Sequence, residues 1–159
     1  MIIQGFDSRY WDGKMPPVHN FKFFAGKLTE SDYFVNHLAP IQFEAAAELG
    51  LPRLGWMFHR CRADIKGSVR IYNTFFRALH VDGLPSLDAE DKSVTRSLAN
   101  ALHVWDTVQE IEQAFGQECM IYTAGWCWDW MVKPYLHPNH PIYQRSLWEA
   151  DPPPPTANP

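Results

Sequence analysis

Three carboxylates gather in the segment GLPSLDAEDKS, residues 83–93: Asp88, Glu90 and Asp91. In a β-strand, residues two apart point to the same side, so Asp88 and Glu90 share one space if this segment ends a strand. Two carboxyl groups about 5 to 10 Å apart, one of them protonated, can together break a glycosidic bond. The competing interpretation is a solvated helix N-terminus, where acids complement the helix dipole; it suits Asp91 well and Asp88 poorly.

Aromatic residues are abundant in the same chain. Three of its seven tryptophans stand in GWCWDWM, residues 125–131, and aromatic rings can cover the apolar faces of sugar rings. For any single tryptophan, packing in the core is the competing interpretation. Paired acids and many aromatic rings together favour chemistry on sugars.

The elements that must position these residues alternate along the chain. Apolar runs predict strands, and stretches with a period near 3.6 residues predict helices between them. The expected strands are 1–7, 21–27, 51–58, 84–90, 118–124 and 145–151. The expected helices begin at Ser31, near residue 65, and at Ser93, which is the expected N-cap of a helix that stops at Gly116. Strict alternation indicates parallel strands joined by helical crossovers.

An α/β chain of this kind forms either an open doubly wound sheet or a barrel. Neither GxGxxG nor GxxxxGK with Ser or Thr stands at the first strand-to-helix turn, which removes the usual nucleotide-binding versions of the open sheet. Acidic and aromatic residues end the predicted strands instead: Asp7, Trp56, Phe58, Asp88, Glu90, Tyr122 and Trp148. Strand carboxyl ends build the active site of a (β/α) barrel, so we expect a barrel with these side chains at its mouth.

Composition narrows the partners. A chain of 159 residues, 46% of them hydrophobic, fits one domain with an apolar core. A net charge of −4 without any basic run argues against nucleic acid or an anionic membrane as the partner. No stretch approaches the ~20 apolar residues of a membrane span, and the N-terminus lacks the pattern of a signal peptide. The odd number of cysteines, Cys61, Cys119 and Cys127, predicts buried free thiols, and the scattered histidines predict neither a metal site nor a cofactor.

Five segments, in order, resemble the family 25 glycoside hydrolases, the muramidases that cleave peptidoglycan. GFDSRYWDG (5–13) resembles the family's GxDxSxxQG opening, LGWMF (54–58) its GxYHF strand, and LPSLDAE (84–90) its PxxDxE strand. MIYTAGWCW (120–128) is similar to its iYT segment and SLWEAD (146–151) to its lWxA strand. The resemblance covers roughly residues 2–151. It identifies 1–151 as a family 25-like catalytic domain, followed by a proline-rich tail, 152–159.

The resemblance implies a (β/α)5β3 barrel that hydrolyses the β-1,4 bond between N-acetylmuramic acid and N-acetylglucosamine in peptidoglycan strands. By position, Glu90 would be the general acid, and Asp88 would stabilise positive charge at the reacting centre or orient the 2-acetamido group. Asp7 would help keep Glu90 protonated by like-charge repulsion. The sugar groove would be lined by Trp56, Phe58, Tyr122, Trp126 and Trp148.

The chain also departs from the family pattern. Trp56 and Met57 stand where the family has Tyr and His, and the family continues through two strands beyond the lWxA segment. The first and sixth strands should therefore have open edges, which a second copy or another polypeptide would cover. Besides a working hydrolase, a glycan-binding or structural module on the same barrel fits the sequence. A nucleotide or sugar-phosphate enzyme on an open sheet is the third interpretation.

Overall fold

The computed structural model describes residues 6–8 and 21–150 of the chain. Six parallel strands form one sheet in the order β1-β2-β4-β5-β6-β7, so sheet neighbours follow each other along the sequence. These strands are β1 (Phe6–Ser8), β2 (Phe24–Glu30), β4 (Arg53–Phe58), β5 (Ser86–Asp88), β6 (Met120–Ala124) and β7 (Leu147–Ala150). The short β3 (Phe34–Val35) pairs antiparallel with the end of β2.

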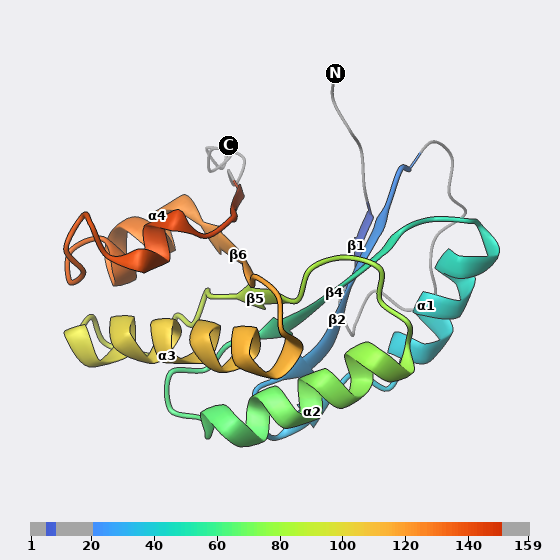
Figure 1. Ribbon diagram of the computed structural model, residues 1–159, viewed down its shortest axis with the longest axis horizontal. Coiled ribbons are helices and arrows are strands. Elements are labelled where there is room, and N and C mark those ends of the chain that lie inside the picture. The colour runs from blue at the N-terminus through green and yellow to red at the C-terminus, as the bar shows by residue number, and fades with distance from the viewer. Residues whose placement is uncertain (1–5, 9–20, 151–159) are drawn as a thin grey trace, which may run out of the picture.

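Three long helices connect the strands and lie along one side of the sheet (Figure 1). They are α1 (Ala39–Glu48), α2 (Ile65–Ala78) and α3 (Leu98–Phe115). After β6 the chain continues as α4 (Gly125–Cys127), a π-helical stretch (Trp128–Val132) and a 3-10 turn (Pro141–Gln144). The parallel strands joined by helices confirm the α/β class expected from the alternation.

The core lies between the sheet and the helices. The outward-facing residues Met57, Leu87 and Ile121 are fully buried and belong to one apolar cluster with helix residues such as Val69 and Val108. Strand side chains alternate between the two faces, so the residues next to these point to the opposite, inner face. The three cysteines are buried and free, as expected.

The inner face of the sheet curves around a pocket of about 340 Å³, here called the inner pocket. All six parallel strands contribute to its lining: Asp7, Ala25, Leu54, Trp56, Ser86, Met120, Tyr122 and Trp148. Among the described residues no pairing joins β1 to β7, so the sheet is curved but not closed. The expectation of a barrel thus holds for the parallel strand order and the curvature, and closure is not observed.

Two predicted helix starts were wrong. The helix expected from Ser31 begins at Ala39, with Pro40 in its first turn, because Ser31 adopts a φ of +47° and the chain turns back into β3. The helix expected from Ser93 begins at Leu98 and is capped by Ser97, whose Oγ accepts from the Asn100 N–H at 3.2 Å. Its end at Gly116, with a φ of +70°, confirms the predicted stop.

Candidate active site

A second pocket of about 640 Å³ opens at the carboxyl ends of the parallel strands, and we call it the rim pocket. The strands set its residues by register: Phe58 of β4 lies beside Asp88 of β5, which lies beside Tyr122 of β6. These are inward-facing positions of three neighbouring strands, so their side chains form one row. The full lining is Asp7, Lys27, Glu30, Trp56, Phe58, Arg60, Asp88, Glu90 and Tyr122.

The three acids expected to share a site all line the rim pocket. Asp88 is the last residue of β5 and is buried, with 6% of its surface exposed. Glu90 lies two residues beyond the end of β5 and is half-buried. Asp7 comes from β1, and its Oδ1 accepts a hydrogen bond of 3.0 Å from the Trp56 indole N–H. The shared space thus exists, although Glu90 reaches it from a loop and not from the strand.

The expected aromatic residues divide into three places. Trp56, Phe58 and Tyr122 line the rim pocket. Trp148 lines the inner pocket and meets the Tyr122 ring edge-to-face, with 5.5 Å between the centroids. Trp126 lines neither pocket; it is 39% exposed in α4, with the Lys92 ammonium 4.7 Å from its ring. The structure therefore brings four of the five aromatic candidates to the curved face and leaves Trp126 on the surface.

A buried lysine on the inner face is the main feature that the sequence reasoning missed. Lys27 of β2 is 4% exposed, its Nζ lies 2.5 Å from Glu30, and the Phe58 ring lies 4.9 Å from the ammonium. A charge with so little access to water needs a partner, and Glu30 and the aromatic face provide it. The sequence FAGKLTE already indicated this position. Lys27 stands two residues after Ala25 on the same strand, so its side chain points to the same face as that pocket residue.

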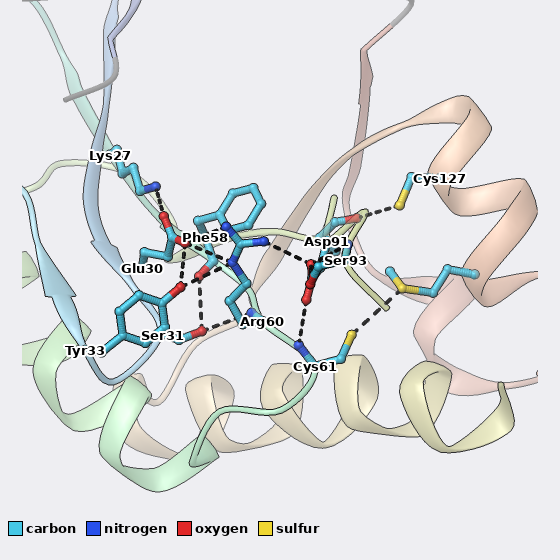
Figure 2. A network of polar contacts seen from close by, with 12 residues as sticks. Lys27, Glu30, Ser31, Tyr33, Phe58, Arg60, Cys61, Asp91, Ser93 and Cys127 are labelled. Carbon is cyan, nitrogen blue, oxygen red and sulfur yellow. Dashed lines mark hydrogen bonds and ion pairs between the residues drawn. The ribbon is translucent and has the colours of Figure 1, made fainter. Parts of the chain in front are cut away.

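Arg60 connects two acids beside the rim pocket (Figure 2). Its guanidinium donates to Glu30 Oε1 from Nη2 at 2.7 Å and from Nε at 2.8 Å, and to Asp91 Oδ1 from Nη1 at 3.0 Å. Tyr33 donates its hydroxyl to the same Glu30 oxygen at 2.6 Å. The result is a continuous polar network from Lys27 to Asp91 along the side of the pocket.

This network keeps its two acids ionised. Burial alone would raise the pKa of Glu30, but the hydrogen bonds from Lys27, Tyr33 and Arg60 outweigh it and lower the pKa to about 2. Burial also opposes ionisation of Asp91, yet hydrogen bonds from Ser93, Arg60 and the Cys61 N–H hold its pKa below the ordinary value. The interpretation of Asp91 as a solvated helix N-terminal acid was therefore wrong, since its side chain is 1% exposed and α3 begins seven residues later.

Two histidines lie in the core close to this network. His59, just after β4, is buried, and its Nε2 lies 3.3 Å from His103 Nδ1 of α3. His103 Nε2 lies 3.2 Å from the Ala63 carbonyl, which can only accept, so this nitrogen carries the proton and Nδ1 accepts from His59. Burial, aided by His103, lowers the pKa of His59 to about 3, against the opposing effect of Asp91. His59 therefore stays neutral near pH 7.

Across residues 6–8 and 21–150, no group of three or more His, Cys, Asp or Glu side chains could hold a metal ion. None of the helices in the described part of the chain has both the length and the hydropathy that a membrane span requires. What the site offers is a pocket lined jointly by acids, aromatic rings and the buried cation of Lys27.

The chain has the fold of the family 25 glycoside hydrolases. The lysozyme from Streptomyces coelicolor matches with a TM-score of 0.75 and 16% identity, over 94% of this chain and 74% of that one. The muramidase from Acremonium alcalophilum matches with a TM-score of 0.74 and 19% identity, over 94% of this chain and 77% of that one. A family 25 glycosyl hydrolase from Bacillus anthracis matches with a TM-score of 0.69 and 16% identity, over 93% of this chain and 70% of that one.

At these identities the likeness is one of fold. No protein-family model matches the sequence, and no curated protein is similar to it. The resemblance seen in five short motifs is thus supported by the arrangement of the whole described chain.

Proposed function

We propose that the chain is a peptidoglycan hydrolase of the muramidase type, which cleaves the β-1,4 bond between N-acetylmuramic acid and N-acetylglucosamine. One observation carries the proposal: Asp7, Asp88 and Glu90 line a single pocket at the carboxyl edge of a sheet with the family 25 fold. The solved structures of this fold include proteins described as muramidase and lysozyme.

Glu90 is the general acid in this proposal. It donates a proton to the glycosidic oxygen as the bond from that oxygen to the sugar C1 breaks, and positive charge develops at C1. Asp88 stabilises this charge, either directly or by orienting the 2-acetamido group to attack C1. Water then adds at C1, and the Glu90 carboxylate takes the proton of that water, which restores the acid.

The remaining residues of the rim pocket bind and orient the sugar. Trp56, Phe58 and Tyr122 present aromatic faces that suit the apolar face of a pyranose ring, and Trp148 supports Tyr122 from the inner pocket. Asp7 is held by the Trp56 indole and adds negative charge beside the reacting acids. Trp126 lines neither pocket but lies on the surface against Lys92, two residues beyond Glu90, and in this proposal it contacts a longer glycan.

The test is the loss of turbidity of a bacterial cell-wall suspension, together with release of new reducing ends. Glu90→Gln keeps the shape of the side chain and removes the transferable proton, so we expect cleavage to fall below detection with the melting temperature unchanged. Glu44→Gln, an exposed glutamate on α1, is the matched control and should cleave like the wild type.

The outcome that contradicts the proposal is also defined. If the wild type and Glu90→Gln bind cell wall equally and neither releases reducing ends at any pH tested, the chain is a glycan-binding module. That was the second interpretation of the sequence, and it uses the same pocket without the acid.

A further inference from the structure

Asp91 follows Glu90 in the sequence, and its side chain makes four hydrogen bonds within a buried corner (Figure 2). Its Oδ1 accepts from Arg60 Nη1 at 3.0 Å, from the Ser93 N–H at 3.0 Å and from Ser93 Oγ at 2.6 Å. Its Oδ2 accepts from the Cys61 N–H at 3.2 Å. Because Arg60 and Cys61 follow β4 directly, these bonds tie the chain after Glu90 to the end of the neighbouring strand.

The residue before Glu90 is tied to the strand on the other side. The Ala89 N–H donates to the Tyr122 carbonyl at 2.9 Å, and the Ala89 carbonyl accepts from Thr123 Oγ1 at 3.0 Å and Cys127 Sγ at 3.3 Å. Glu90 is thus the single residue between two anchored neighbours. Among the described residues its own carboxyl makes no hydrogen bond, which leaves both oxygens available to the pocket.

The charges of the corner agree with a fixed role for Asp91. Arg60 stands between Glu30 and Asp91, and Glu30 is also paired with Lys27, so two cations balance two ionised acids. Asp91 does not line the rim pocket and cannot touch a substrate there. Any effect of Asp91 on the reaction must therefore act through the residues it holds.

We propose that Asp91 is a positioning residue for Glu90: bound by Arg60, Ser93 and the Cys61 N–H, it fixes the backbone that aims the general acid at the glycosidic oxygen. This role rests on the proposed function. A general acid must lie within hydrogen-bond reach of the oxygen it protonates, and a displacement of about 1 Å can lower the rate about 10²-fold.

The test compares Asp91→Asn with a variant of a second Arg–Asp pair. Arg53, at the opposite end of β4, binds Asp82 with Nε at 3.0 Å and Nη2 at 3.3 Å, far along the strand from the rim pocket. Arg53→Met therefore removes an ion pair with a more exposed aspartate and leaves the contacts around Asp91 intact. Turnover is measured on soluble glycan strands released from peptidoglycan, per folded molecule, with the folded fraction taken from glycan-binding stoichiometry.

For Asp91→Asn we expect kcat to fall about 10²-fold while KM changes less than about twofold, since Asp91 does not line the rim pocket and the aim of Glu90 is lost. Arg53→Met should keep the wild-type kcat even where its melting temperature falls as far. In a Glu90→Gln background, adding Asp91→Asn should leave glycan affinity unchanged, because the two residues act as one unit.

Two further outcomes keep the proposal decidable. If Asp91→Asn does not fold, Ser93→Ala removes only the hydroxyl bond of 2.6 Å and should still lower kcat, by about tenfold. If the wild type cleaves glycan but Asp91→Asn and Ser93→Ala have the same kcat per folded molecule as Arg53→Met, the positioning role is overturned and the proposed function stands. If the wild type cleaves no glycan, the proposed function is overturned and this role falls with it.

Discussion

The acids around the rim pocket fall into two groups that differ in their partners. Glu30 and Asp91 are each bound by cations and hydroxyl groups, and their lowered pKa values keep them ionised throughout the neutral range. Glu90 makes no side-chain hydrogen bond to another described residue, and it faces the pocket. Hydrogen-bonding partners thus distinguish the structural acids Glu30 and Asp91 from Glu90, the acid proposed to react. Position in the sequence DAED alone does not make this distinction.

His59 leads to a prediction about stability and pH. Its pKa of about 3 in the folded protein lies below its ordinary 6.5, so between these values the unfolded chain binds a proton that the folded chain does not. The free energy of unfolding should therefore be highest above pH 6.5 and fall as the pH is lowered, by up to about 1.4 kcal/mol per pH unit. Glu30 begins to add to this loss only below about pH 4.5.

Urea unfolding between pH 7.5 and 5 measures this slope. His59→Gln should unfold with a flatter pH dependence than the wild type over this range, whereas His37→Gln, at an exposed position, should keep the wild-type slope. Equal slopes for all three proteins would show that another group dominates the acid response.

The site residues on strands could be predicted from the sequence, while those fixed by tertiary contacts could not. Asp88, Trp56, Phe58 and Tyr122 were found because strand parity and strand ends are local properties of the chain. The position of Asp91 depends on Arg60, about thirty residues away, and no local pattern encodes that meeting. Trp126 lines neither pocket, because a tryptophan after a strand can turn either toward the pocket or toward solvent, and its contact with glycan stays a prediction.

At the scale of elements, Tyr72 of α2 joins two strands of the sheet. Its buried hydroxyl donates to the Gly55 carbonyl of β4 at 2.7 Å and accepts from the Ser86 N–H of β5 at 2.8 Å. The hydroxyl thus bridges the two strands that carry Trp56, Phe58 and Asp88 into the site. A helix on the outer side of the sheet therefore fixes the spacing of residues on the inner side.

Tyr72→Phe should lower the free energy of unfolding by about 1–3 kcal/mol, because the buried Ser86 N–H loses its partner. Chemical denaturation gives this value directly. Tyr143→Phe is the control, since its hydroxyl makes one longer bond of 3.3 Å from a half-buried position and should contribute less than about 1 kcal/mol. A loss for Tyr72→Phe no larger than that of the control would contradict the bridging role.

The element boundaries that sequence reasoning missed share a cause in polar side chains. Asn36 falls within the helix expected from Ser31, yet it is buried and donates to the Lys27 carbonyl at 2.8 Å, which holds the turn between β3 and α1. Ser93 and Ser97 are equally good N-caps in isolation. Ser93 is bound to Asp91, so Ser97 caps α3. Such choices are made by tertiary partners.

For the whole molecule, the parallel order of the strands followed from their alternation with helices, but closure of the sheet did not. Closure depends on the number of strands and their stagger, which local patterns do not contain. Among the described residues, β1 and β7 are the two ends of the sheet and do not pair with each other. These ends carry backbone groups next to an apolar interior.

We expect the purified chain to associate in solution, with a second copy covering the edge at β1 or β7, because the end strands of an open sheet readily pair with another chain. Light scattering coupled to size-exclusion chromatography measures the mass over a range of concentrations. A stable monomer at high concentration would argue against association through these edges.

The strand order that follows the sequence also bears on how the molecule is made. Each parallel strand pairs with one that leaves the ribosome before it, and no described strand has to be inserted between two already paired. Each newly formed strand pair therefore closes only the segment between two consecutive parallel strands. The sheet can grow at one edge while the chain is being synthesised. The rim pocket is then assembled in the order of translation: Asp7 first, Lys27 and Glu30 of β2 next, then the β4 residues, then Asp88 with Glu90, and Tyr122 completes the lining when β6 docks.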